Sequence, residues 1–411
     1  MLLGAPQITL ALIRAYSRRR PFALSVMMAV VFLLLPALQT GASDIEPVVV
    51  AKFDRQLWPE PINSIAGFNT ASRAFLLAFV FALQETLQTI AASDADSPTP
   101  LETTILDRGS VRKWLTRERT QLLRNYQIAS RHCMANDWTC AAIVRTYEDL
   151  VSKSQALPST MPSKLQPWWK DMRNLSRGYV SEQLRLAALF PTVSSEIDRF
   201  NDNEWNGDAL PDRQFFLTFD DGPSPVHGTT DEVLTMLETE KKSAVFFVIG
   251  INFQDRLNKT GSAAIAELYR NNCVASHGWE HQSHAMWDQW QESIARTQAL
   301  VSATIVASNT LPLFRPPYGQ RRADIRAFFR AQSLQVALWN LDSQDWNTQV
   351  DSKDIVNRMI ALMLIKRHGV MLFHDVQPKA SVALPLIFKD LGGAVEWGDC
   401  HRLAKPAPTI Q

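Results

Sequence analysis

The sequence has almost no excess of charge of either sign. Its 411 residues include 42 Lys and Arg against 41 Asp and Glu, which gives a net charge of +1. A protein that binds nucleic acid through its phosphates needs a basic face or stripe, and this balance provides none. Cysteine is scarce, with four residues, and residues 44–210 contain no fixed-period repeat. The charge balance therefore gives no electrostatic sign of nucleic-acid binding, and the 46% hydrophobic content is typical of a globular protein with one membrane-directed segment.

That membrane-directed segment lies at the start of the chain. Arg18, Arg19 and Arg20 precede an apolar run over residues 22–38, and small residues follow it. This order is typical of a secretory signal peptide, and the run is short for a membrane span of about 20 residues. The long stretch before Arg18 favours an uncleaved signal-anchor instead. Residues 1–43 are therefore expected to be a signal peptide or signal-anchor, and the rest to be exported: periplasmic, membrane-anchored or secreted.

The four cysteines agree with export, because disulfides persist in oxidising compartments. Cys133 and Cys140 could close a small loop, and Cys273 could pair with Cys400. Four cysteines allow three pairings. Cys273 could equally be a small buried apolar residue.

Residues 44–210 are expected to form a mainly helical accessory region. Helices are predicted over 71–89, 110–131, 137–150 and 168–190, with a Ser/Asp/Pro linker at 93–100 and a Pro-rich break at 157–167. The apolar stretch 74–83 is too short to cross a bilayer, so a buried helix is expected. The region is interpreted as a helical spacer or packing domain. The alternative is a partner- or wall-binding module with Trp168 and Trp169 as contacts.

Residues 217–224 read Leu-Thr-Phe-Asp-Asp-Gly-Pro-Ser, an apolar run that ends in two carboxylates and a Gly-Pro turn. Adjacent strand residues point to opposite faces, and the turn can bring Asp220 and Asp221 back toward one point with different roles. An acidic turn after a strand is the alternative for Asp-Asp-Gly alone.

Two histidines four residues apart, His277 and His281, have a spacing suited to one divalent metal. A catalytic zinc keeps one position open beside three nitrogen or carboxylate ligands, so Asp221 would complete the set. His284 is expected to be a loop histidine and not a fourth ligand. Four of the eight histidines lie in segments of this kind, and this clustering favours function: His277, His281, His284 and His374.

Three further apolar runs end in charged or aromatic residues, at 314–319, 339–346 and 370–375. Reactive groups at successive strand ends indicate a parallel β/α architecture with its site at the carboxyl ends of the strands.

In order and spacing, these five segments resemble the NodB-homology polysaccharide deacetylases, carbohydrate esterase family four. The resemblance covers about Pro211–Cys400. It implies an α/β fold, a distorted (β/α) barrel, and removal of N-acetyl or O-acetyl groups from polysaccharides with a divalent metal. The chain would then consist of the mainly helical N-terminal region 44–210, a deacetylase domain over 211–400 and a C-terminal tail over 401–411.

The resemblance implies a role for each matching residue. Asp221, His277 and His281 would bind the metal, usually zinc, although cobalt, nickel or manganese could occupy the same ligands. Asp220 would be the base that activates water, and Arg315 would pair with it and orient it. A cation and Arg315 would both favour the ionised form of that base.

The remaining matches concern the acid and the substrate. His374 resembles the general acid, and Asp345 resembles the carboxylate that tunes it and favours its imidazolium form. The backbone amide of Tyr318 resembles the donor to the oxyanion. Trp346 would form a wall of the site, and Leu372 would line the pocket for the acetyl methyl group.

The chain departs from the family pattern at Gly278, where Ser or Thr is usual, so a hydroxyl that would brace the loop is missing. Trp287 and Trp290 follow in a distinctive segment and are interpreted either as sugar-stacking residues or as packing between a helix and the barrel. Asp342 is expected to brace its loop.

The sequence thus predicts a metal-dependent deacetylase that acts on an acetylated envelope or extracellular polysaccharide. One alternative is a non-catalytic carbohydrate-binding or scaffold protein. Another is a deacylase of a lipid-linked sugar. No nucleic-acid partner is expected, and membrane association would occur through the N-terminal segment. The sequence does not identify the polymer or the oligomeric state.

Overall fold

The computed structural model describes residues 50–51, 58–92, 107–133, 136–140, 143–190 and 197–404. They belong to one compact unit, Val48–Gln411. The expected signal segment 1–43, the linker 93–100 and residues 405–411 of the expected tail lie outside the described residues.

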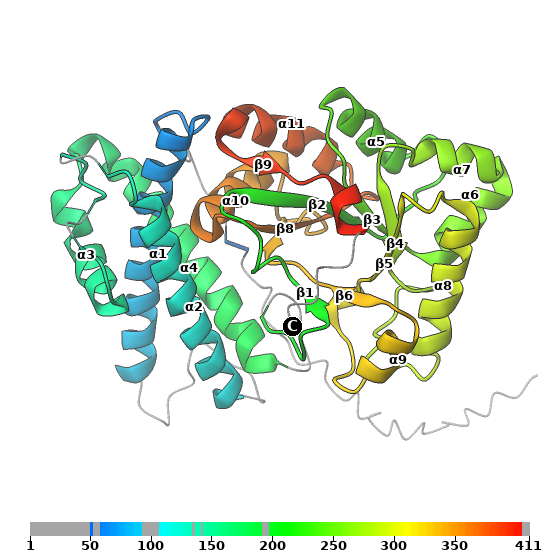
Figure 1. The fold of residues 1–411 in the computed structure, drawn as a ribbon. Helices are drawn as coiled ribbons and strands as arrows, with labels where there is room; N and C mark the ends of the chain where they lie inside the picture. Colours follow the sequence, from blue (N-terminus) through cyan, green and yellow to red (C-terminus); the bar gives the residue numbers. More distant parts are fainter. Residues whose placement is uncertain are drawn as a thin grey trace, which may run out of the picture. The chain divides into compact units, whose positions relative to one another are not determined.

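A parallel sheet forms the centre of this unit (Figure 1). Its strand order is β1-β6-β5-β4-β3-β2-β8-β7, and β9 also pairs with β2. Within the described residues no pairing joins β1 to β7, so the barrel is open between them. The expected α/β fold with a distorted barrel is confirmed. The strands are β1 (Glu204–Trp205), β2 (Gln214–Asp220), β3 (Val245–Val248), β4 (Cys273–Ser276), β5 (Thr310–Phe314), β6 (Gln335–Ala337), β7 (Leu341–Asp342), β8 (Gly369–His374) and β9 (Glu396–Trp397).

Strand β2 lies in the interior of the sheet, between β3 and β8. Six of its seven residues are buried, as expected for a parallel strand that is covered on both faces. In the register of β2 and β8, Asp220 lies opposite His374. The ends of these two central strands therefore bring a carboxylate and an imidazole together.

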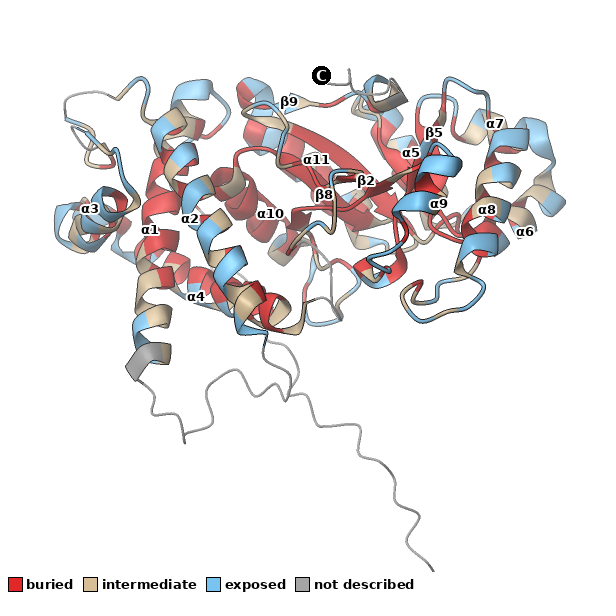
Figure 2. Ribbon diagram, turned by 60° about the horizontal axis from the view of Figure 1, so that its bottom comes forward, coloured by how far each residue is buried: buried red, intermediate tan, exposed pale blue. Residues whose placement is uncertain are grey.

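Helices cover the sheet and leave their outer faces exposed (Figure 2). Helices and strands mostly alternate along this part of the chain, as expected for β/α units, although α6 and α7 both lie between β3 and β4. The helices are α5 (Thr229–Thr239), α6 (Gly250–Thr260), α7 (Ser262–Leu268), α8 (Trp290–Thr304), α9 (Arg326–Ala331), α10 (Ser352–Lys366) and α11 (Lys379–Leu391), with 3₁₀ turns at Pro317–Gly319, Gly392–Ala394 and Cys400–Ala404.

The region before the sheet is helical, as expected. It contains α1 (Ile65–Ala92), α2 (Arg108–Ala129), α3 (Tyr147–Thr160) and α4 (Gln166–Leu189), with a 3₁₀ turn at Ser163–Leu165. Among the described helices, α1 alone is long and apolar enough to cross a membrane, but most of its apolar segment is buried in the protein. The apolar stretch 74–83 is thus part of a buried helix, as predicted.

The predicted helix over 137–150 is wrong in its first part. The Asp137 carboxylate accepts hydrogen bonds from Thr139 and pairs with Arg73, which favours a turn there. Helix α3 instead begins after Thr146, which forms a capping box with Asp149. The predicted break at 157–167 is wrong at its start, because α3 continues through Pro158, three residues before its C-cap Met161.

Trp168 and Trp169 are core residues, not partner contacts. Both are buried, and Trp168 packs edge-on against Trp58 with ring centroids 4.9 Å apart. Trp169 packs in the same way against Phe81 at 5.3 Å. Burial of such large side chains contributes to packing and leaves little surface for a ligand. The binding-module alternative thereby loses its candidate contacts.

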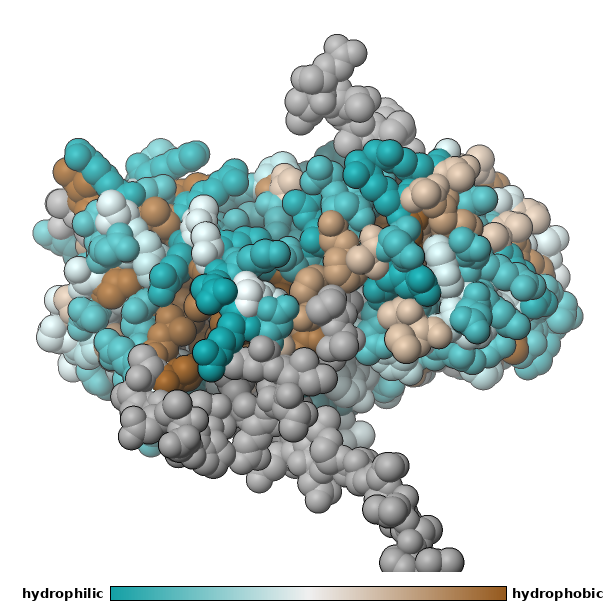
Figure 3. All heavy atoms as spheres, turned by 90° about the horizontal axis from the view of Figure 1, so that it is seen from below, coloured by the Kyte–Doolittle hydropathy of each residue, from teal (hydrophilic) through white to brown (hydrophobic). Residues whose placement is uncertain are grey.

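Helix α10 lies between the helical region and the sheet (Figure 1). Its residues 355–365 are all buried, and all of them except Asn357 and Arg358 are apolar. Helices α1 and α2 both pack against it. The face drawn in Figure 3 is mainly hydrophilic, with hydrophobic side chains in small groups. The helical region therefore covers a part of the barrel that would otherwise be an apolar surface.

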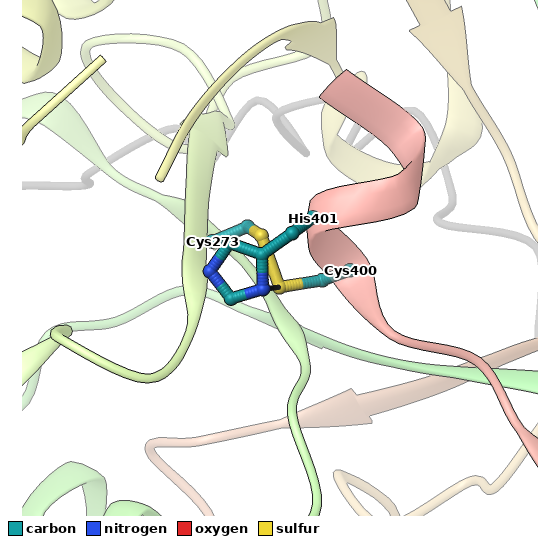
Figure 4. A group of neighbouring side chains, drawn as sticks. All are labelled: Cys273, Cys400 and His401. Atoms are coloured by element: carbon teal, nitrogen blue, oxygen red, sulfur yellow. Dashed lines mark hydrogen bonds between the residues drawn. A yellow bond between two sulfur atoms is a disulfide. The ribbon is translucent and has the colours of Figure 1, made fainter. Parts of the chain in front are cut away.

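Both expected disulfides are present. Cys133 pairs with Cys140, and Cys273 at the start of β4 pairs with Cys400 (Figure 4). His401 Nδ1 lies 3.8 Å from the Cys400 sulfur, but both sulfurs are bonded, so neither offers a thiolate to a metal. The second disulfide ties the C-terminal 3₁₀ turn to the strand that leads into His277.

Candidate active site

Asp220 is the last residue of β2, and its buried carboxylate is held by one guanidinium. Arg315 follows β5, and its Nη1 donates to Asp220 Oδ1 at 2.9 Å and to Thr218 Oγ1 at 2.6 Å. The same guanidinium donates to the carbonyls of Ala337 and Leu338 and lies 4.1 Å from the centroid of the Phe247 ring. A buried arginine with this many partners is fixed in place, and it fixes the orientation of Asp220.

The donor atoms of three residues converge beside Asp220. Asp221 follows it with a left-handed backbone, φ 77°, and its Oδ1 lies 3.4 Å from Nε2 of both His277 and His281. The three donor atoms lie within 4.8 Å of one another. Asp221 Oδ1 is buried and makes no hydrogen bond with the described residues. An unpaired buried carboxylate oxygen facing two imidazole nitrogens fits a divalent cation.

The other nitrogen of each imidazole is occupied. His277 Nδ1 lies 2.7 Å from the carbonyl oxygen of Arg315, so Nδ1 carries the proton and Nε2 is free to bind a metal. His281 Nδ1 lies 3.1 Å from the Tyr318 hydroxyl. Outer contacts of this kind hold metal-binding histidines in orientation.

The protonation states of these residues also suit a cation. Burial opposes ionisation of Asp221, but His277, His374 and His281 together hold its pKa well below the usual range. Burial and the neighbouring His277 lower the pKa of His281. The carboxylate is therefore ionised and the His281 ring neutral near pH 7, the forms that bind metal.

His374 ends β8, and Asp345 holds it at two points. The Asp345 Oδ1 lies 2.7 Å from His374 Nδ1, and its Oδ2 accepts the His374 backbone N–H at 2.9 Å. Burial lowers the pKa of His374, but Asp345, helped by Asp221 and Asp220, outweighs it and raises this pKa to about 10. The geometry favours an imidazolium whose Nε2 proton faces the site.

The loop that carries Asp345 is built from two turns in which a side chain accepts a backbone N–H. Asp342 Oδ1 accepts from the Gln344 amide at 2.8 Å, and Ser343 Oγ accepts from the Asp345 amide at 3.3 Å. Gln344 has a left-handed backbone, φ 59°. Asp342 braces the loop, as predicted.

The other predicted site residues lie around these groups. Tyr318 has a left-handed backbone, φ 58°, its side chain is exposed, and its ring is 4.4 Å from that of His281. Strained non-glycine residues of this kind cluster at functional sites. Trp346, after Asp345, is 51% exposed. Leu372 is buried in a small cluster with Trp339 and Val370.

His284 takes the place of the missing brace at Gly278. Its Nδ1 lies 2.8 Å from the Gln282 carbonyl and its Nε2 3.0 Å from Ser293 Oγ, so it is not a metal ligand, as predicted. Ser293 Oγ also accepts the Trp279 amide at 2.7 Å. A Cβ at residue 278 would lie 2.6 Å from the His284 ring. The His284 side chain thus fills the space that a side chain at position 278 would need.

The two tryptophans of this segment are used in packing. Trp287 lies edge-on to His284, with centroids 5.5 Å apart. Trp290 begins α8 and lies edge-on to Phe328 at 5.0 Å. Both are partly buried. The packing interpretation therefore describes them better than sugar stacking.

Asp375 is the last residue of the segment 370–375, and the sequence alone indicated no role for it. Asp375 is buried, its Oδ2 accepts the Thr230 hydroxyl at 2.7 Å, and its amide donates to the Asp220 carbonyl at 3.3 Å. A Cβ at Gly222 would lie 2.0 Å from Oδ2, so only glycine allows this approach. Asp375 thus supports the turn that carries Asp220 and Asp221. Its place directly after His374 in the sequence Phe-His-Asp is the feature that could have indicated this role.

Together the fold and the site define a class: a parallel β/α protein with a candidate metal site at the carboxyl ends of its strands. Residues 207–337 match the family model described as polysaccharide deacetylase. The match covers less than half of the chain, and through this segment the chain is similar to polysaccharide deacetylases.

The similar proteins are named for different polymers. The chain is 31% identical over 177 residues to peptidoglycan-N-acetylmuramic acid deacetylase PdaC of Bacillus subtilis. This match covers 43% of this chain and 35% of that protein. The chain is 32% identical over 166 residues to chitin deacetylase 1 of Saccharomyces cerevisiae, covering 38% of this chain and 50% of that protein. The chain thus spans between a third and a half of these two relatives.

Among solved structures, a family 4 carbohydrate esterase from Streptomyces lividans in complex with acetate is 30% identical in sequence to this chain. The match covers 45% of this chain and 91% of that one, with a TM-score of 0.39.

Proposed function

We propose that this protein is a metal-dependent hydrolase that removes acetyl groups, foremost N-acetyl groups, from an envelope or extracellular polysaccharide. The observation that carries the proposal is the convergence of the Asp221, His277 and His281 donor atoms beside the carboxylate of Asp220 and the imidazole of His374. The match of residues 207–337 to the family model described as polysaccharide deacetylase supports the same conclusion.

Asp221, His277 and His281 would hold a divalent metal. Two imidazole nitrogens and one carboxylate oxygen favour zinc, and cobalt, nickel or manganese suit the same donors. When bound, such a cation supplies a Lewis acid that makes water easier to deprotonate and polarises an acyl carbonyl.

Asp220 would act as the general base. Its carboxylate takes a proton from the attacking water, and the hydrogen bond from Arg315 keeps one carboxylate oxygen in place while the other faces the site. Water oxygen then adds to the acetyl carbonyl carbon. The Tyr318 backbone N–H would donate to the oxygen on which negative charge develops.

His374 would act as the general acid. Its Nδ1 is held by Asp345, so its Nε2 proton is the one available to the leaving nitrogen. Transfer of that proton lets the carbon–nitrogen bond break and yields acetate and a free amine on the sugar. The acid must be protonated to do this, and Asp345 favours that form because it raises the pKa of His374 against the effect of burial.

The substrate would lie across the open face of the site. Trp346 and Tyr318 are both exposed beside it and could contact sugar rings through their apolar faces. Leu372 would line the space for the acetyl methyl group. The names of the relatives point to N-acetylated polymers such as peptidoglycan or chitin, and two disulfides favour an oxidising compartment outside the cytoplasm.

Acetate release tests this function. The full chain, purified in detergent, would be incubated with N-acetylated peptidoglycan fragments, chitin oligomers and a lipid-linked N-acetyl sugar. The proposal predicts acetate in an amount equal to the new free amine, loss of release with a chelator, and recovery on addition of zinc. Release that a chelator leaves intact, or a folded and zinc-loaded protein that releases no acetate from any of the three, would contradict it.

A further inference from the structure

We propose that the helical region positions the candidate acid through Glu182 and Arg358, which hold the loop that carries Asp345. The inference rests on the proposed function, because it concerns the acid that this function needs. It also gives the region before the family segment a role beyond covering the barrel.

Arg358 of α10 joins the helical region to this loop. Its Nη1 and Nη2 donate to the two carboxylate oxygens of Glu182 in α4, at 3.1 and 2.7 Å. Its Nε donates to the Asp342 carbonyl at 2.9 Å. Two parallel bonds to one carboxylate fix the plane of the guanidinium, so the Nε–H direction is fixed as well.

Glu182 is itself held from the other side. Its Oε1 accepts the Ala51 amide at 2.6 Å, and Arg358 Nη1 donates to the Ala51 carbonyl at 3.0 Å. The side chain of Arg358 is 2% exposed and that of Glu182 8%. Buried charges this well paired resist rearrangement, since removal of one partner leaves the other as an uncompensated charge.

The Asp342 carbonyl is where the first turn of the loop begins. Asp342 pairs with Leu372 at the end of β7, and its side chain accepts the Gln344 amide in the turn that leads to Asp345. Asp345 then contacts both the ring and the backbone of His374. An unbroken series of hydrogen bonds and turns therefore leads from α4 to the candidate acid.

Without the Glu182 carboxylate, Arg358 would lose the two hydrogen bonds that fix the plane of its guanidinium. Its Nε–H would then no longer be held toward the Asp342 carbonyl, where the first turn of the loop begins. Asp345 would in turn lose the position from which it holds His374.

Two matched variants test this. Glu182→Gln removes the charge from the α4–α10 pair. Glu118→Gln does the same for the α2–α10 pair, in which the Lys366 ammonium contacts Glu118 at 2.9 Å and donates its hydrogen bonds to Glu118, not to the Asp345 loop. We expect Glu182→Gln to lower kcat about 10- to 100-fold with KM and bound zinc unchanged, the size typical of a lost outer contact. Hydrogen exchange of residues 341–346 should also become faster, and Glu182→Asp should recover part of both.

Glu118→Gln should lower the melting temperature and leave kcat and exchange of residues 341–346 as in the unmodified protein. Equal kcat and equal loop exchange in the two variants would overturn the positioning role, as would faster exchange spread evenly over the chain in Glu182→Gln. If the unmodified protein releases no acetate, the proposed function fails instead, and the exchange of residues 341–346 alone decides whether Glu182 holds the loop.

Discussion

Gly278 has a backbone φ of +88°, and a Cβ there would collide with the His284 ring. The space that a hydroxyl at this position would use is occupied by His284 and Ser293. The loop between the candidate ligands His277 and His281 is thus braced by His284 and Ser293, and this arrangement requires glycine at position 278.

Gly278→Ser should therefore weaken the protein, although serine is usual in the family at this position. We expect a loss of about 1–3 kcal/mol in the free energy of unfolding, from the left-handed backbone and the collision with His284. Zinc affinity should fall too. Chemical denaturation and zinc titration measure these changes. Gly393→Ser is the control, because a Cβ there meets no atom within 4 Å. Equal stability of the two variants would contradict this explanation.

The charge of Asp345 predicts a change in pH dependence. Asp345 is the main cause that raises the pKa of His374, to about 10, against the effect of burial. The acid is protonated below its pKa and is lost as the pH rises through it. Asp345→Asn should therefore move the alkaline limb of the kcat profile to lower pH, by about 1–3 units.

Profiles of the zinc-loaded unmodified protein and of Asp345→Asn would be compared at the same zinc content. An alkaline limb at the same pH in both would show that Asp345 does not set the protonation of the acid.

Single residues also show where sequence reasoning stops. Asp220 and His374 stand in short motifs at strand ends, so they could be predicted without knowledge of the fold. Ser293 contacts Trp279 and His284 from the following helix, and Asp375 contacts Thr230, 145 residues earlier. Only the packing of α8 and the register of β8 bring them to the site, and neither follows from local pattern.

Of the two disulfides in the described residues, Cys273–Cys400 closes the longer loop of the chain. It joins residues 127 apart, against 7 for Cys133–Cys140. In the chain-entropy account a longer loop restricts the unfolded chain more. Replacement of both cysteines by Ala should cost about 4–5 kcal/mol for Cys273–Cys400 and about 2–3 kcal/mol for Cys133–Cys140. Urea denaturation measures both, and a larger loss for the short loop would contradict this account.

The elements were predictable in unequal measure. Helices α2 and α4 were expected within two residues of their observed bounds, and strands β2 and β8 end at the motif residues Asp220 and His374. The start of α3 was not, because the Asp137 turn depends on Arg73 from α1. A contact between distant segments decides the local structure there, and propensity alone cannot reveal it.

In the whole molecule, the helical region and the barrel share one core. Ser72 of α1 donates to the Leu364 carbonyl, and Asn125 of α2 donates to the Ile365 carbonyl, both at the end of α10. The sequence predicted a helical region but not where it packs. A helix with as many apolar residues as α10 is expected to be buried, but its sequence does not show which elements cover it.

Removal of residues 44–196, which contain α1 to α4 but not β1, should therefore make the remainder of the chain aggregate. The apolar residues of α10 that α1 and α2 cover would become exposed, and large apolar patches promote association. Size-exclusion chromatography of residues 197–411 measures this, and coexpression with residues 44–196 should restore a soluble form. A fragment that is monomeric and active by itself would contradict a shared core.

The most direct test of the central claim compares the unmodified chain with Asp220→Asn at equal bound zinc. The claim is that Asp220 activates water beside a metal held by Asp221, His277 and His281. The account predicts that acetate release on the preferred N-acetylated oligomer falls about 10²- to 10⁴-fold in Asp220→Asn, while zinc affinity and folding stay close to those of the unmodified chain. Acetate release at the unmodified rate by a zinc-loaded Asp220→Asn variant would contradict the account.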